Sequence, residues 1–150
     1  MEHDLTYISN FDIDSILHAL ETKNPKFKFL GSFPCDFQEL PYADKRFTID
    51  IDDLNEKGYS TLGIVINTGS SKTHGQYWSS LYIDIDQQSI YFIDIRGTPI
   101  PKYLIGYINK IGCAKYKIQW KKEECDFIYP IVYIAQMVDL SITTLDGLFR

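Results

Sequence analysis

The residues best suited to chemistry lie in the segment Gln119–Asp126, where a strand-like stretch and a charged loop lead to a cysteine. Cys125 stands directly before Asp126–Asp139, a nearly continuous apolar stretch that we predict to be a buried helix with Pro130 kinking it or fixing its first turn. A thiol at a helix N-terminus lies near the positive end of the helix dipole, which stabilises the thiolate. A cysteine beside an apolar helix is, however, more often an inert core residue, so both interpretations stay open on this evidence.

Other common chemical motifs are missing from the sequence. The three histidines, His3, His18 and His74, are scattered, and no pair of cysteines has zinc-binding spacing. The sequence contains no GxxxxGK[ST], GxGxxG or GxSxG motif. The acidic stretches at Asp50–Asp53 and Asp84–Asp86 alternate with isoleucine, which is typical of the solvated face of a strand. We therefore predict neither a metal nor a cofactor.

Composition restricts the class of protein. The chain has 150 residues and a net charge of −5, which argues against a surface that follows nucleic-acid phosphates. Three cysteines without framework spacing favour a reducing compartment. The start of the chain is not a signal peptide by its pattern, and the longest apolar run, Phe127–Val138, is too short to span a bilayer. We expect one domain, residues 1–150, that is not secreted and acts inside a cell or a virus particle.

The elements that would position Cys125 follow from periodicity and from turn residues. Apolar residues at helical spacing from Ile13 to Leu20 predict a helix that ends at Asn24-Pro25. The expected strands are Phe27–Leu30, an alternating strand through Phe47, Ile49 and Ile51, a strand buried on both faces at Thr61–Ile66, a hairpin of Trp78–Ile85 and Ile90–Ile95, and Tyr116–Trp120. Asp52–Gly58 and Gly69–Gln76 should be polar loops, and a helix should run from Pro101 to Gly112. This pattern predicts a single α+β domain.

The order of short motifs resembles the adenovirus-protease/Ulp1 type of papain-like cysteine peptidase, and its viral members in particular. The matching pieces, in chain order, are Phe29, Gly31, Phe33, Asp36, Leu40 and Pro41; Ile64–Thr68; Gly75–Trp78 with Leu81–Asp84; Tyr91–Gly97 with Pro99 and Pro101; and Gln119 with Cys125. The resemblance covers nearly the whole chain. It implies a mixed central sheet with flanking helices and a buried helix that starts at the cysteine.

The resemblance also implies roles for particular residues. In this family a cysteine thiolate attacks a peptide or isopeptide carbonyl, a histidine moves the proton, and an acid orients the histidine. By position, Cys125 would be the nucleophile, Asp94 the orienting acid and Gln119 the donor to the oxyanion. Trp78 would be the aromatic residue beside the histidine, at the substrate. Family members often favour small residues, especially glycine, beside the scissile bond.

Two departures from the family pattern keep the function open. Tyr77 stands where the histidine should be, and a phenol with an ordinary pKa near 10 is a poor base at neutral pH. Asp126 replaces the glycine after the cysteine, and its negative charge opposes formation of a thiolate. His74, in the loop ahead of Tyr77, is a substitute base in one interpretation and a solvent-exposed residue in the other.

Two functions therefore compete. One is an active viral cysteine endopeptidase that cleaves a protein or peptide substrate, such as capsid precursors or ubiquitin-like conjugates. The alternative is an inactive pseudoprotease that serves as a binding or minor virion protein. An unrelated α+β domain, with Cys125 in its core, is a third and weaker hypothesis.

Overall fold

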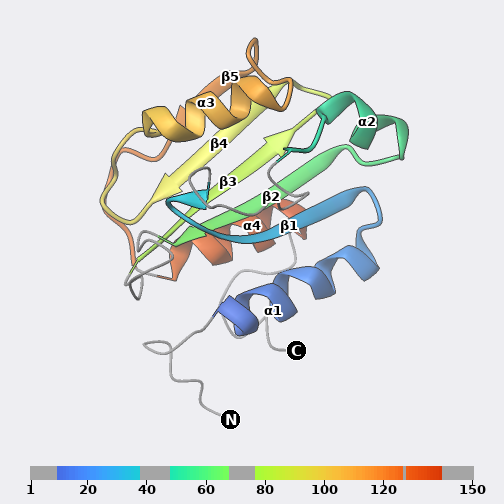
Figure 1. The fold of residues 1–150 in the computed structure, drawn as a ribbon. Coiled ribbons are helices and arrows are strands. Elements are labelled where there is room, and N and C mark those ends of the chain that lie inside the picture. The colour runs from blue at the N-terminus through green and yellow to red at the C-terminus, as the bar shows by residue number, and fades with distance from the viewer. Residues whose placement is uncertain (1–9, 38–47, 68–76, 127, 140–150) are drawn as a thin grey trace.

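The structure is a computed structural model that describes residues 10–37, 48–67, 77–126 and 128–139. Its centre is a five-stranded mixed sheet in the order β1-β2-β3-β4-β5 (Figure 1). β1 pairs parallel with β2 and β4 parallel with β5, whereas β2, β3 and β4 pair antiparallel. The strands are β1 (Phe27–Pro34), β2 (Thr61–Asn67), β3 (Trp78–Asp84), β4 (Ser89–Asp94) and β5 (Lys117–Trp120).

Helices cover both faces of this sheet. α1 (Asn10–Lys23) and α4 (Tyr129–Val138) lie on one face, and α2 (Ile51–Glu56) and α3 (Lys102–Lys110) lie on the other (Figure 1). β2 shows why both layers are needed, because Leu62, Ile64 and Ile66 belong to the core cluster under α3 whereas Val65 belongs to the cluster under α1 and α4. The strand is thus buried on both faces, as its continuous apolar sequence predicts.

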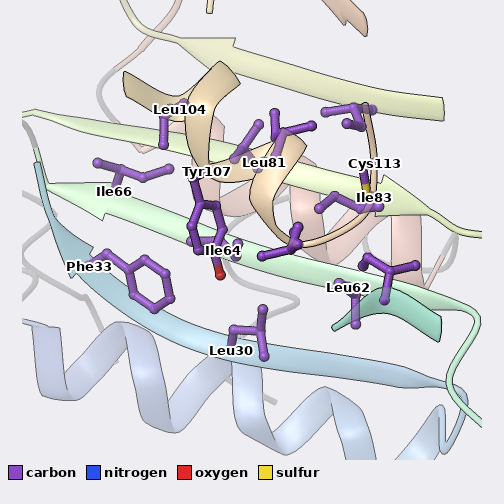
Figure 2. Packing of buried hydrophobic residues seen from close by; sticks show 14 of the residues in the cluster. Leu30, Phe33, Leu62, Ile64, Ile66, Leu81, Ile83, Leu104, Tyr107 and Cys113 are labelled. Carbon is purple, nitrogen blue, oxygen red and sulfur yellow. The ribbon is translucent and has the colours of Figure 1, made fainter. Parts of the chain in front are cut away.

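Tyr107 is a large buried member of the core under α3. Tyr107 reaches from α3 toward β1 and β2, where it lies beside Phe33 and Ile64 (Figure 2). Its ring meets the ring of Phe33 edge-on, with the centroids 6.1 Å apart. This contact packs α3 against β1 across the sheet.

Most of the predicted elements are confirmed. α1, β2, the hairpin of β3 and β4, α3 and β5 all lie where periodicity places them, and Gly112, with φ of 107°, follows the end of α3 as its stop. β1 runs further than predicted, to Pro34. The predicted loop Gly69–Gln76 lies wholly outside the described residues. In the described part of the chain no helix has the length and apolar character needed to cross a membrane.

The predicted strand through Phe47, Ile49 and Ile51 is wrong. Phe47 lies outside the described residues, and Ile51 begins helix α2, which also replaces most of the predicted loop Asp52–Gly58. The reason is a local cap: the carboxylate of Asp50 accepts a hydrogen bond from the N–H of Asp52 at 3.1 Å. Two acidic residues in the first turn add a favourable interaction with the helix dipole. The alternation of isoleucine and aspartate therefore marks a helix start.

The predicted buried helix is present, but it begins later than expected. α4 starts at Tyr129, about one helical turn beyond Cys125, with Pro130 in its first turn. Proline is tolerated there because the first N–H groups of a helix have no partner within the helix. Cys125 therefore lies in the segment before α4 rather than at its first residue.

Candidate active site

The carboxyl end of β4 and the start of β3 lie side by side at the same end of the sheet. Ser79 pairs with Asp94 in the antiparallel register of these two strands. The Ser79 hydroxyl donates a hydrogen bond of 2.7 Å to Oδ2 of Asp94, and both residues are buried. Asp94, the predicted acid, is thus held at this end of the sheet by a hydrogen bond from Ser79, its neighbour on β3.

A tight turn after β4 brings the Cys125 segment against Asp94. The N–H of Gly97 donates to the carbonyl of Asp94 at 3.0 Å, and Gly97 has φ of 71°. A Cβ at Gly97 would lie 2.5 Å from the carbonyl oxygen of Lys122, so the two backbones touch at this point. Only glycine fits such an approach without displacing the chain.

Cys125 is held by the same turn. Its N–H donates to the carbonyl of Ile95 at 2.9 Å, and its Sγ donates to the carbonyl of Asp94 at 3.8 Å. The thiol is only partly buried. The structure therefore brings together two of the predicted residues, since the Cys125 thiol contacts the main-chain carbonyl of Asp94.

The Asp94 side chain is an ionised partner of Arg96. Arg96 Nε donates to Oδ1 at 2.9 Å and its Nη2 donates to Oδ2 at 2.9 Å, while the N–H of Arg96 also reaches Oδ1 at 2.8 Å. Burial by itself raises the pKa of Asp94, but the hydrogen bonds from Arg96 and Ser79 outweigh it, so this pKa lies below its ordinary value. The same contact raises the pKa of Arg96.

The depressed pKa of Asp94 predicts a loss of stability in acid. Because the folded pKa lies below the unfolded one, near 3.9, the unfolded chain binds the proton more readily in this window. The stabilisation is complete above about pH 5 and falls as the pH drops through the folded pKa. We expect the melting temperature of the native chain to fall more between about pH 5 and pH 3 than that of Asp94→Asn. Equal falls in the two proteins would contradict this assignment.

The thiol of Cys125 is not activated by the described residues. Burial raises its pKa, Lys121 opposes this effect, and the negative charges of Asp94 and Asp126 add to it, with a net rise. The direction of the Asp126 effect is the one expected from the sequence. Since α4 begins at Tyr129, the helix dipole, which falls off within one turn, gives Cys125 less help than predicted. The described surroundings therefore favour the protonated thiol.

Tyr77, the residue predicted at the histidine position, lies directly before β3, two residues ahead of Ser79. Ser79 is the partner of Asp94 in the register of β3 and β4. The Tyr77 side chain is 43% exposed, and it acts electrostatically on Arg96. His74 lies outside the described residues, and within the described ranges the one imidazole is that of His18 on α1, which is paired with Glu21.

Two other predicted residues are placed apart from the Asp94 carboxylate. Trp78 is only 6% exposed and belongs to the core cluster of α1 and α4, so it packs the fold. Gln119 is exposed on β5, the edge strand, opposite Tyr91. The substrate contact of Trp78 and the oxyanion role of Gln119 stay predictions.

Sequence reasoning missed Arg96, Ser79 and a cavity beside them. The cavity has a volume of about 240 Å³ and is lined by, among others, Cys35, Ser79, Asp94, Arg96 and Tyr103. The alternation of side chains along a strand could have placed Ser79 on the same face of the sheet as Asp94. No sequence pattern, however, predicts the bidentate bond between the Arg96 guanidinium and the Asp94 carboxylate, which we call the fork. Among the described residues, no group of three or more His, Cys, Asp or Glu side chains could hold a metal ion.

Comparison with solved structures identifies the architecture. The ASFV pS273R protease superposes with a TM-score of 0.70 at 17% identity, covering 97% of this chain and 66% of that one. The Ulp1 protease domain in complex with Smt3, the yeast orthologue of SUMO, gives 0.53 at 12% identity and covers 95% of this chain and 71% of that one. The chain has the fold of the Ulp1-type cysteine peptidases.

A sequence relative is also named as a thiol protease. A protein of Acanthamoeba polyphaga mimivirus, named "Putative thiol protease R355", is 28% identical over 123 residues, or 82% of this chain. The chain spans 39% of the length of that protein. No family model matches the sequence. The resemblance to viral cysteine peptidases of this type is confirmed, together with the mixed sheet that it implied.

Proposed function

We propose that this chain is a viral cysteine peptidase domain that acts on protein substrates by acyl transfer to Cys125. The observation that carries the proposal is the placement of the partly exposed Cys125 thiol against the end of β4, beside Asp94, within a Ulp1-type fold. Protein substrates are supported by the Ulp1 complex with Smt3 and by the relative named as a thiol protease. Capsid precursors and ubiquitin-like conjugates are the substrates we propose, inside an infected cell or a virus particle.

The chemistry needs a nucleophilic sulfur at a neutral pH. The sulfur gives its proton to a base and attacks the carbonyl carbon, and the carbon–nitrogen bond breaks as the leaving amine takes that proton. Water then cleaves the thioester, which releases the acid and restores the Cys125 thiol. Because the described neighbours raise the pKa of the thiol, this step needs a base from outside the described set, such as His74.

A fluorogenic peptide that ends in Gly-Gly before the fluorophore tests the proposal. The native chain should release the fluorophore, and Cys125→Ala should abolish the release. Cys35→Ala is the matched control, because Cys35 is also partly buried and lines the neighbouring cavity, and the proposal assigns the acyl transfer to Cys125. Release that persists in Cys125→Ala, or no release by the native chain, would overturn the proposal.

A second candidate is binding without cleavage, and one observation favours it. In the described part of the chain, the group that the Cys125 thiol contacts is a main-chain carbonyl, which is no base. This candidate predicts that a Gly-Gly peptide with a permanently attached fluorescent label shows higher anisotropy on binding the native chain, while the fluorogenic peptide releases no fluorophore. It fails if hydrolysis is seen and depends on Cys125.

A further inference from the structure

The carboxylate of Asp94 has no acceptor position left. A carboxylate offers about four hydrogen-bond acceptor positions. In this structure Oδ1 accepts from the main-chain N–H and from Nε of Arg96, and Oδ2 accepts from Nη2 of Arg96 and from the Ser79 hydroxyl. The residue is 1% exposed, so solvent does not compete for it. Any further donor must displace one of these four.

This saturation matters for the acid's predicted role. An acid orients a catalytic base by accepting the N–H of an imidazole, which then takes its proton from the nucleophile. A bidentate bond between guanidinium and carboxylate is among the strong hydrogen-bonded contacts in proteins, and it also fixes the geometry of both groups. An imidazole N–H therefore has to displace a stronger donor before Asp94 can orient it.

Arg96, and not Asp94, is the exposed member of this pair. The Arg96 side chain is 57% exposed while the Asp94 side chain is 2% exposed. Tyr77, Tyr103 of α3 and Asp94 all act electrostatically on the guanidinium. The exposed group at this site is thus the guanidinium, and the carboxylate lies behind it.

We propose that Arg96 is a positioning residue, whose guanidinium binds both oxygens of the Asp94 carboxylate. This fork keeps the carboxylate from orienting a base beside Cys125. The inference rests on the proposed function, because it assigns the regulation of the same site. In this state the fork lies within the turn after β4, to which the Cys125 N–H is bonded, and release of Arg96 is the event that frees Asp94 for an imidazole.

An introduced imidazole reports on the fork directly. In Tyr77→His, NMR should find an imidazole pKa at or below its ordinary value of about 6.5, because a cation faces the ring and Asp94 is saturated. In the double variant Tyr77→His/Arg96→Gln, the free carboxylate should raise this pKa by about one unit or more. Alkylation of Cys125 by iodoacetamide at neutral pH, followed by peptide mass spectrometry, should be at least about ten-fold faster in the double variant than in Tyr77→His.

Tyr77→His/Lys102→Gln is the matched control. Lys102 is an exposed cation at the start of α3, so its replacement changes the net charge equally and leaves the fork intact. This control should behave like Tyr77→His. An imidazole pKa that is already raised in Tyr77→His, or that is unchanged in the Arg96→Gln background, overturns the inference. Neither readout requires that the native chain cleave a peptide, so the proposed function can fail while the inference stands.

A second measurement decides the case if the Tyr77 variants do not fold. The carboxyl ¹³C shift of Asp94 can be titrated in the native chain and in Arg96→Gln. Loss of the fork should raise the pKa of Asp94, since the bonds from Arg96 are the largest of the effects that lower it. An unchanged titration contradicts the inference.

Discussion

Gly97→Ala should destabilise the chain by about 2–5 kcal/mol and disturb the segment that carries Cys125. Two effects add up. A non-glycine residue in the left-handed region costs about 1–2 kcal/mol, and relief of an overlap in a packed site costs about 1–3 kcal/mol. The overlap is with main-chain atoms, since the new Cβ would lie 2.5 Å from the Lys122 carbonyl oxygen and 2.9 Å from the Glu123 carbonyl carbon. Urea unfolding measures the loss.

Gly58→Ala is the control for this prediction. Gly58 also has a positive φ, of 101°, but a Cβ there would meet nothing within 4 Å. The backbone strain is present in both variants, whereas the clash is present at Gly97 alone. We therefore expect Gly97→Ala to be the more destabilising and to change the rate at which iodoacetamide alkylates Cys125. Equal losses would mean that the turn after β4 does not press on the Cys125 segment.

Trp78→Ala should cost about 3–5 kcal/mol of unfolding free energy, as expected for the removal of a large buried aromatic side chain. Trp78 lies at the start of β3 and belongs to the core between the sheet and the α1–α4 layer. Because Ser79 follows it directly, loss of Trp78 should also loosen the start of β3, which pairs with Asp94. Urea unfolding followed by far-UV circular dichroism gives the free energy without reliance on tryptophan emission.

The second tryptophan of the chain supplies the comparison. Trp120 is 38% exposed on the edge strand β5, where the ammonium group of Lys122 lies 5.4 Å from its ring centroid. Trp120→Ala should cost no more than about 1 kcal/mol, the size of an exposed cation–π contact. If the two substitutions cost the same, Trp78 is not the packing residue that the structure makes it, and its predicted substrate contact gains weight.

Much of the architecture was predictable because it depends on local periodicity. The apolar run of β2, the hairpin of β3 and β4, and the stop at Gly112 each follow from spacing or from a single turn residue. The error at Ile51 has a physical cause, since an alternating pattern and a capped helix start share the same residues over a short stretch. A longer stretch of the same alternation would have distinguished a strand from a helix start.

The candidate site was only partly predictable. The motif order pointed to Cys125 and Asp94, and the structure joins them. Arg96 was missed because its bond to Asp94 depends on how the turn after β4 folds back, and spacing along the chain does not encode this. The start of α4 beyond Cys125 was missed for a similar reason, since Pro130 is compatible with either a kink or a first turn.

The main-chain bonds that hold Cys125 have a consequence for how such a site can change over generations. The N–H of Cys125 and the carbonyl of Ile95 that accepts from it belong to the main chain, so this bond is available whatever side chains the two residues carry. Substitutions that alter the reacting groups can therefore accumulate while the scaffold that presents them persists. Related proteins can therefore differ in their reacting side chains at the end of β4 and still share the same main-chain arrangement.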